Sequence, residues 1–215
     1  MFQNRQDAAQ RLAQRLEKYR GKDGIVLAIP RGGVPVGYVI ARQLGFPLEV
    51  VLSKKIGHPN NSEYAIGSVS LDGVAVDERA ASGISAAYIE QQASHIQARL
   101  RESYQLFMDG RQPTSLNGKT VIVVDDGIAT GNTMASTVQA IRKSQPARLI
   151  VAVPVAPPHA QRMLSPQVDE FVCLLLPHEF AAVGQFYVDF DQVSDEEVIR
   201  LLRKSSGGYP GGRAG

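Results

Sequence analysis

Five continuous apolar runs along the chain predict buried strands, and the segments between them carry apolar residues at helical spacing. The runs are GIVLAIP (24–30), PLEVVLS (47–53), TVIVV (120–124), ARLIVAVPV (147–155) and VDEFVCLLL (168–176). Helices are predicted at 33–44 and at about 133–143, after the first and third runs. Strands that are apolar at every position are typical of a parallel sheet covered on both faces. The sequence therefore predicts an α/β fold: a central, mostly parallel sheet with helices on both faces.

Three further helices are predicted outside this alternation. Apolar spacing indicates a helix at about 4–20 and a long one that contains Ile89, Ala93, Ile96, Leu100 and Phe107. Ser194 and Glu197 form a capping box that begins a last helix. We expect a single domain over residues 1–206 and a disordered tail at 207–215.

Residues 54–83 fit neither the strand nor the helix pattern. Their composition, with GHPNNSEYAIGSVSLDG at 57–73, predicts a long flexible loop that holds a small hairpin. Loops of that length are uncommon inside compact domains and are often lids over a site. We therefore expect a lid at about 54–83.

A segment of small and hydroxyl-bearing residues follows the third apolar run. It consists of Gly127, Ile128, Ala129, Thr130, Gly131, Asn132 and Thr133. Backbone N–H groups in such a turn, together with the N-terminus of the following helix, form a pocket for a phosphate, and the two threonines add hydroxyl donors. The segment matches neither the Walker loop nor the dinucleotide fingerprint.

Two adjacent carboxylates, Asp125 and Asp126, stand immediately before this phosphate cradle. Acids beside a phosphate repel it unless the ligand also carries hydroxyls, which two carboxylates can accept from a ribose diol. Mg²⁺ bound nearby offsets the remaining negative charge. The alternative is a solvated turn whose acids cap the next helix. It leaves unexplained why acids, small residues and threonines occur together, so we expect a sugar phosphate with a cis-diol.

The loop after the first strand adds a second anion site. Pro30, Arg31, Gly32 and Gly33 combine a guanidinium with a backbone that can bend closely around a ligand. Alone, this loop could equally be an ordinary glycine turn. Together with the cradle, it indicates a ligand with a phosphate at one end and a pyrophosphate at the other.

These two loops resemble those of type I phosphoribosyltransferases. VIVVDDGIATGNTM (121–134) is similar to their motif for 5-phosphoribosyl-1-diphosphate (PRPP), and AIPRGGVPVG (28–37) to their pyrophosphate loop. The resemblance covers about 24–155 as the core, and implies a small hood from about 1–22 and 165–204. It also implies that the lid segment is the flexible catalytic loop.

The resemblance implies a role for each segment. Asp125 and Asp126 would bind the ribose hydroxyls, and the cradle would bind the 5-phosphate. Arg31 and Gly32 would contact pyrophosphate, commonly across a non-proline cis peptide in this family. Lys54 and Lys55 would close over the site with the lid. Mg²⁺ would be the cofactor, held mainly by the substrate, with Asp125 and Asp126 as candidate ligands.

The implied activity is transfer of the 5-phosphoribosyl group from PRPP to a nitrogenous base or amine, with release of pyrophosphate. The alternative is a regulatory protein that senses PRPP without turnover. Regulators in this family usually add an element that reads nucleic acid, and the sequence has neither a recognisable helix-turn-helix nor a strong basic stripe. The retained lid lysines favour the enzyme.

The acceptor has no readable motif. Glu63 and Tyr64 would approach it from the lid, although each could equally be a solvated side chain. Phe186 and Tyr187 would stack on a planar base, with core packing as the alternative. His178 is a further candidate. Enzymes for 6-oxopurines carry an aspartate where this chain has Ala129, which disfavours hypoxanthine or guanine as the acceptor.

Composition narrows the setting without naming a partner. A net charge of +2 gives no reason to expect nucleic acid, and no apolar stretch is long enough to span a membrane. The N-terminal segment lacks the apolar region of a secretory signal, and Cys173 alone forms no internal disulfide. We expect a cytoplasmic protein. Dimers are common among similar proteins, and the sequence leaves a homodimer as an open alternative.

Overall fold

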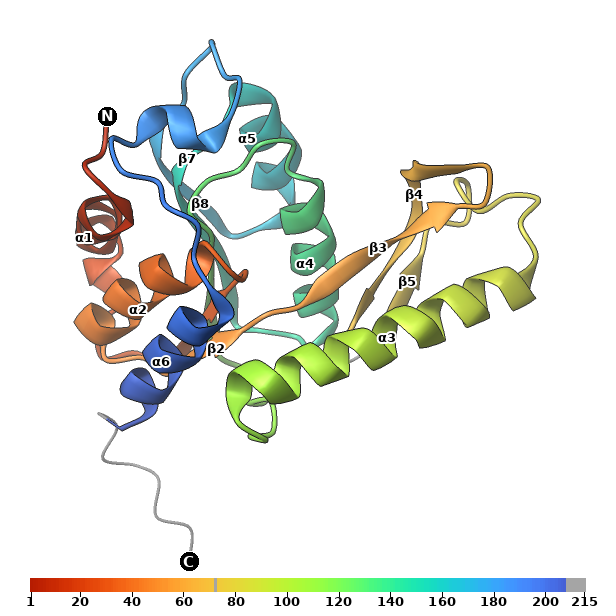
Figure 1. Ribbon diagram of the computed structural model, residues 1–215, viewed down its shortest axis with the longest axis horizontal. Helices are drawn as coiled ribbons and strands as arrows, with labels where there is room; N and C mark the ends of the chain where they lie inside the picture. Colours follow the sequence, from red (N-terminus) through yellow and green to blue (C-terminus); the bar gives the residue numbers. More distant parts are fainter. Residues whose placement is uncertain (72, 208–215) are drawn as a thin grey trace, which may run out of the picture.

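The computed structural model describes residues 1–71 and 73–207, and its centre is a five-stranded parallel sheet (Figure 1). The strand order is β2-β1-β6-β7-β8, and every neighbouring pair is parallel. The strands are β1 (Gly24–Ala28), β2 (Leu48–Val50), β6 (Thr120–Val124), β7 (Arg148–Val155) and β8 (Glu170–Leu175). The predicted α/β fold is confirmed. The predicted tail at 207–215 lies outside the described residues from position 208 onwards.

Helices cover both faces of this sheet. On one face lie α1 (Arg5–Arg15), α2 (Gly33–Leu44) and α6 (Asp195–Ser206); on the other lie α4 (Asn132–Lys143) and α5 (Pro158–Leu164). Neighbouring residues of one strand enter opposite layers: Val26 packs under α2, and Ile25 packs under α4. This double burial is the reason that the strands are apolar at every position.

The helix predicted at about 4–20 is divided in two. α1 ends at Arg15 and a short 3-10 helix, η1 (Glu17–Tyr19), follows it. Sequence reasoning missed α5 and the 3-10 helices η2 (Ser165–Gln167) and η3 (Val183–Phe186), which are too short to show a periodic pattern.

The chain reverses its direction of winding between β1 and β6. The connection from β1 runs through α2 to one edge of the sheet, and the connection from β6 runs through α4 towards the other. Ala28 and Val124, the last residues of the two strands, are register partners, so the following loops begin at the same level. Ligands of open α/β sheets bind in the crevice at such a switch point.

Residues 53–71 and 73–103 form an arm that projects from the core (Figure 1), and the end of the helix that follows is buried in the central core through Tyr104, Phe107 and Met108. The arm consists of an antiparallel sheet, β3 (Ser53–His58), β4 (Asn61–Ser70) and β5 (Val74–Val76), packed on the long helix α3 (Ala86–Met108). The small hairpin expected within 54–83 is present as β3 and β4, whereas the long loop around it was wrong, because most of the segment is strand. A register irregularity between Ile56 and His58 interrupts the alternation that would have revealed the strands.

The arm has an apolar cluster of its own, made by Ile56, Ile66, Val69, Ala93 and Ile96. Its attachment to the core includes a hydrogen bond of 2.7 Å between the hydroxyls of Ser53 and Thr137 of α4. None of the helices in the described part of the chain is both long and apolar enough to cross a membrane.

The segments expected to form the hood lie side by side. Phe2 forms a parallel bridge with Tyr187, and its N–H donates to the Phe186 carbonyl at 2.8 Å. Their role as a hood over the acceptor stays a prediction.

Replacing Ile66 by Ala tests whether the arm is a separate cooperative unit. Ile66 is fully buried in the arm cluster, and we expect its truncation to destabilise the arm by about 2–5 kcal/mol. Hydrogen exchange should accelerate in β4 and α3 while β6 stays protected. Tyr64→Ala, at a side chain that is 52% exposed in the same strand, is the control. Equal acceleration in β6 would show that arm and core unfold together.

Candidate functional site

The two predicted loops meet at the switch point. Ile29 N–H donates to the Val124 carbonyl at 2.9 Å, which joins the end of β1 to the end of β6. A Cβ on Gly32 would lie 2.0 Å from Oδ2 of Asp126, so a side chain there would displace this carboxylate. The peptide between Pro30 and Arg31 is cis, in agreement with the resemblance. The loop at 30–33 and the acid pair therefore form one continuous site.

The phosphate cradle divides into a supporting part and an exposed part. Gly127, Ile128 and Gly131 are buried, whereas the exposed positions are Ala129, Thr130, Asn132 and Thr133. Gly131 adopts a left-handed φ of 87° that turns the chain into α4, and no side chain caps this helix terminus. The first backbone N–H groups of α4 thus point towards the turn without a side-chain cap, as an anion site requires.

Burial sets the charge of the acid pair. It raises the pKa of Asp125 well above its ordinary value, and the neighbouring Asp126 raises it further. The N–H of Asp126 donates to Oδ1 of Asp125 at 2.8 Å. The fold therefore makes ionisation of Asp125 less favourable than in water.

Arg5 compensates the second carboxylate and was missed from the sequence. Its Nε lies 2.8 Å from Oδ2 of Asp126, and the two side chains are only 13% and 14% exposed. Its Nη1 donates to the Asp191 carbonyl at 2.6 Å, and its guanidinium lies 3.9 Å from the centre of the Phe190 ring. In the sequence, Arg5 is one of several cations of an amphipathic helix, and no local signal separates it from the rest.

Tyr187 and Phe186, the aromatic residues expected to stack on a base, both pack against other protein groups. Tyr187 is 5% exposed, its hydroxyl donates to the Asp126 carbonyl at 2.5 Å, and burial raises its pKa. Phe186 packs on Phe180 with ring centres 5.3 Å apart. Of the two alternatives, core packing holds for Tyr187. Phe190 lines the pocket at the acid pair instead.

That pocket has a volume of about 500 Å³ and is lined by Arg5, Arg31, Gly32, Asp126, Val183, Phe190, Asp191, Gln192 and Val193. It joins the pyrophosphate loop to the acid pair and continues onto the C-terminal segment. The pocket therefore borders the loop at 30–33, the acid pair and the C-terminal segment at once.

The lid candidates lie in the arm. Lys54 is exposed and Lys55 is half-buried, both in β3, and neither is among the described residues that line the pocket at the acid pair. Tyr64 and Asn132 instead line a cavity of about 560 Å³ between the arm and the start of α4. The side chain of Glu63 lies outside what the structure describes. The arm thus borders the phosphate cradle.

Two other singled-out residues are not among the described residues that line the pocket at the acid pair. His178 is exposed on the segment after β8. Cys173 is half-buried in β8, burial raises its pKa to about 11, and its thiol donates to the Leu175 carbonyl. Cys173 packs against the core cluster that contains α4 and α5.

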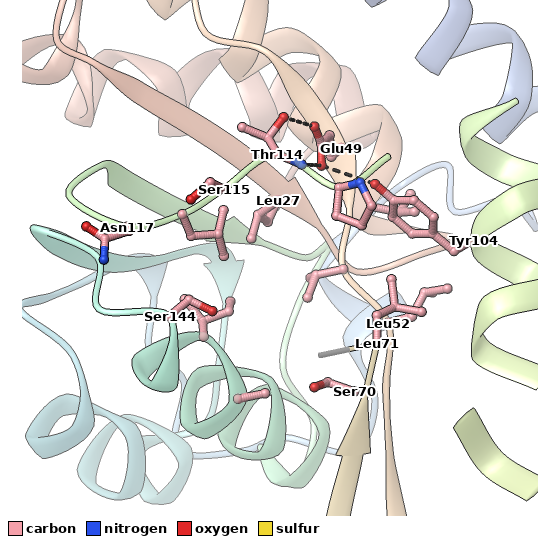
Figure 2. A pocket seen from close by; sticks show the side chains of 16 residues that line it. Leu27, Glu49, Leu52, Ser70, Leu71, Tyr104, Thr114, Ser115, Asn117 and Ser144 are labelled. Carbon is pink, nitrogen blue, oxygen red and sulfur yellow. Dashed lines mark hydrogen bonds between the residues drawn. The ribbon is translucent and has the colours of Figure 1, made fainter. Parts of the chain in front are cut away.

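A separate cavity of about 320 Å³ opens between β2, the end of α4 and the arm (Figure 2). The residues that line it include Leu27, Glu49, Leu52, Tyr104 and Ser144, and none of the predicted site residues. The Glu49 carboxylate is already bound at 3.2 Å by both the Tyr104 hydroxyl and the Thr114 N–H. No Lys or Arg is among the described residues that line this cavity.

The sequence profile of the phosphoribosyl transferase domain matches residues 2–191. The chain belongs to this family. The resemblance inferred from the two loops is therefore confirmed. The acid pair lies inside the matched residues of this phosphoribosyltransferase domain.

Among curated proteins, "Putative phosphoribosyl transferase Rv0571c" of Mycobacterium tuberculosis is 38% identical over 208 residues. The match covers 95% of this chain and 47% of that protein, so the chain spans about half the length of the curated relatives it matches.

Solved structures show the same fold. The crystal structure of TT1426 from Thermus thermophilus is 37% identical, has a TM-score of 0.87, and the match covers 94% of this chain and 98% of that one. A hypothetical protein from Neisseria gonorrhoeae, crystallised with ppGpp, has a TM-score of 0.52 at 15% identity, with 95% and 98% covered. The second likeness concerns the fold alone.

Replacing Asp125 by Asn in this phosphoribosyltransferase domain should stabilise the unliganded protein at high pH. The raised pKa means that the favourable contribution of Asp125 to the free energy of unfolding is complete below its ordinary pKa of 3.8 and is lost as pH rises through the raised value. Asn keeps the acceptor for the Asp126 N–H and carries no charge.

Urea unfolding at pH 5 and pH 8 measures this effect. The gain from Asp125→Asn should be larger at pH 8. Asp189→Asn, at an exposed position, is the control. A gain that is the same at both pH values would contradict the raised pKa of Asp125.

Proposed function

We propose that this chain transfers the 5-phosphoribosyl group from PRPP to a nitrogenous base or amine and releases pyrophosphate. The observation that carries this proposal is the contact between the two loops, in which Gly32 lies directly against the Asp126 carboxylate. A diol acceptor and a pyrophosphate loop must be neighbours if one ligand is to bind both, since C1 of the ribose carries the pyrophosphate and C2 carries a hydroxyl.

Each part of the ligand has a counterpart in the site. Asp125 and Asp126 accept the ribose hydroxyls, and the turn from Gly127 to Thr133 binds the 5-phosphate through the first N–H groups of α4. The loop at 30–33 and the Arg31 guanidinium bind the pyrophosphate. These assignments follow the family's motif, and the exposed face of the turn and the uncapped start of α4 support them.

The reaction needs positioning more than covalent participation by the protein. The bond from C1 to the pyrophosphate oxygen breaks as the acceptor nitrogen approaches the opposite side, through a transition state with oxocarbenium character. Asp125 and Asp126 hold the ring by its hydroxyls, and Arg31 balances the charge that develops on the leaving group. The surrounding side chains exclude water that would otherwise hydrolyse PRPP.

Mg²⁺ fits this site as a companion of the ligand. In the described part of the chain, no three His, Cys, Asp or Glu side chains gather into a metal site. Mg²⁺ prefers oxygen ligands and commonly binds through one or two carboxylates and the substrate's phosphates, and Asp125 and Asp126 supply such carboxylates. When bound, the ion neutralises the leaving pyrophosphate. A nearby dication also favours the ionised form of Asp125, whose pKa burial raises.

A protein that senses PRPP without turnover is the second candidate. It is favoured by the position of Lys54 and Lys55, which lie in a formed strand of the arm and do not line the pocket at the acid pair. A sensor needs the ligand site without a closing lid.

Pyrophosphate release separates the two candidates. We expect the protein, incubated with PRPP, Mg²⁺ and a panel of free bases and amines, to release pyrophosphate with at least one acceptor faster than with none. PRPP binding without acceptor-dependent release across the panel would favour the sensor.

The double variant Asp125→Asn, Asp126→Asn tests the diol assignment. Loss of both charged acceptors should weaken ribose 5-phosphate binding at least 100-fold, about 2.7 kcal/mol, because charge-assisted hydrogen bonds are the strongest available to hydroxyls. Calorimetry measures the affinity, and circular dichroism checks the fold. Affinity equal to that of the wild type would exclude these residues as the diol acceptors.

A further inference from the structure

The guanidinium assigned to pyrophosphate already has a carboxylate partner. Nε of Arg31 lies 2.6 Å from Oδ1 of Asp195, and the two side chains are 49% and 38% exposed. Asp195 is the first residue of α6, and 164 positions along the chain separate it from Arg31. An acid from the C-terminal helix thus occupies the donor that the ligand's leaving group needs.

The same C-terminal segment also contacts the other cation of the site. The Asp191 carbonyl accepts from Nη1 of Arg5 at 2.6 Å, and Asp191, Gln192 and Val193 line the pocket with both arginines. The stretch from 191 to 195 therefore holds Arg5 and Arg31 at once. It forms the wall of the site opposite the sheet loops.

Asp195 is fixed in place by its helix. Ser194 caps α6 by accepting the Glu197 N–H at 3.2 Å, and Val198 and Leu202 are fully buried in the core cluster that contains α2. Because α6 is anchored in this way, Asp195 cannot follow Arg31 when the longer side chain turns towards a ligand. A pyrophosphate oxygen that takes Nε of Arg31 therefore replaces the contact with Asp195.

We propose that Asp195 sets the affinity for pyrophosphate by competing with it for Arg31. The proposal rests on the function proposed above and names a residue outside the family's motif. A carboxylate and a phosphoryl group offer a guanidinium the same kind of paired-oxygen acceptor. In the unliganded site, Asp195 takes the place of the phosphoryl oxygens. After turnover, it takes Arg31 back as pyrophosphate leaves.

The effect is modest because the pair is half-exposed. Exposed ion pairs contribute little, so removing the competitor should tighten pyrophosphate binding by about two- to five-fold. Loss of a nearby negative charge acts in the same direction. The direct contact between Asp195 and Arg31 therefore has to be distinguished from the weaker electrostatic repulsion between any nearby carboxylate and pyrophosphate.

Asp195→Asn and Glu196→Gln form a matched pair for this purpose. Glu196 is the exposed neighbour on the same helix turn, and its carboxylate also feels the charge of Arg31. Calorimetry with pyrophosphate and Mg²⁺ should show two- to five-fold tighter binding for Asp195→Asn and less than a 1.5-fold change for Glu196→Gln. Ribose 5-phosphate, which lacks the leaving group, should bind both variants as it binds the wild type.

The same comparison in an Arg31→Ala background tests the mechanism. There, Asp195→Asn should change pyrophosphate affinity by less than 1.5-fold, because the Arg31 guanidinium for which the two acceptors compete is absent. Thermal unfolding confirms that each variant is folded. A gain that persists without Arg31, or equal gains for Asp195→Asn and Glu196→Gln, would overturn the competition while leaving the proposed function intact. A wild type that binds neither ribose 5-phosphate nor pyrophosphate would overturn both.

Discussion

The close approach of Gly32 to the Asp126 carboxylate is the constraint on which the candidate site depends. β1 and β6 are neighbours in register to their last residues, so the loops that leave them compete for one crevice. A single methyl group at position 32 would lie 2.0 Å from a carboxylate oxygen. Because glycine has no side chain, the loop at 30–33 and the two carboxyl groups can lie side by side at one edge of the sheet. The crevice that results can hold both the hydroxyls and the leaving group of one sugar.

Placing two acids in this crevice has consequences for the rest of the molecule. Burial makes ionisation of Asp125 unfavourable, and Asp126 is neutralised by a residue from the other end of the domain's sequence. That residue, Arg5, lies on Phe190, and Phe190 stacks on Tyr187, which in turn bonds to the Asp126 backbone. The N-terminal helix and the C-terminal segment are therefore part of the electrostatic balance of the site. Ligand affinity and stability of the unliganded fold act against each other at Asp125.

The sequence predicts those parts of the structure whose physics is local. Each strand of the central sheet is a short apolar run, and VIVVDDGIATGNTM contains its strand, its acids and its turn in a single stretch. Arg5 and Asp195 escaped prediction because their importance lies in contacts with residues more than 100 positions away. Phe186 and Tyr187 show the same limit. An aromatic pair in a polar segment does not reveal which ring is buried and which neighbour, here Phe190, faces the pocket.

The arm shows how a wrong prediction changes the view of function. A flexible loop can close over a ligand at little cost, whereas β3 and β4 share an apolar cluster with α3, whose last turn is buried in the central core. Any approach of Lys54 or Lys55 to the acid pair therefore has to carry the whole arm. At the base of the arm, the Ser53–Thr137 hydrogen bond joins β3 to α4, and Glu49 ties Thr114 and Tyr104 to β2. The contacts at the base of the arm, and not the local sequence of residues 54–83, therefore determine how far Lys54 and Lys55 can approach the acid pair.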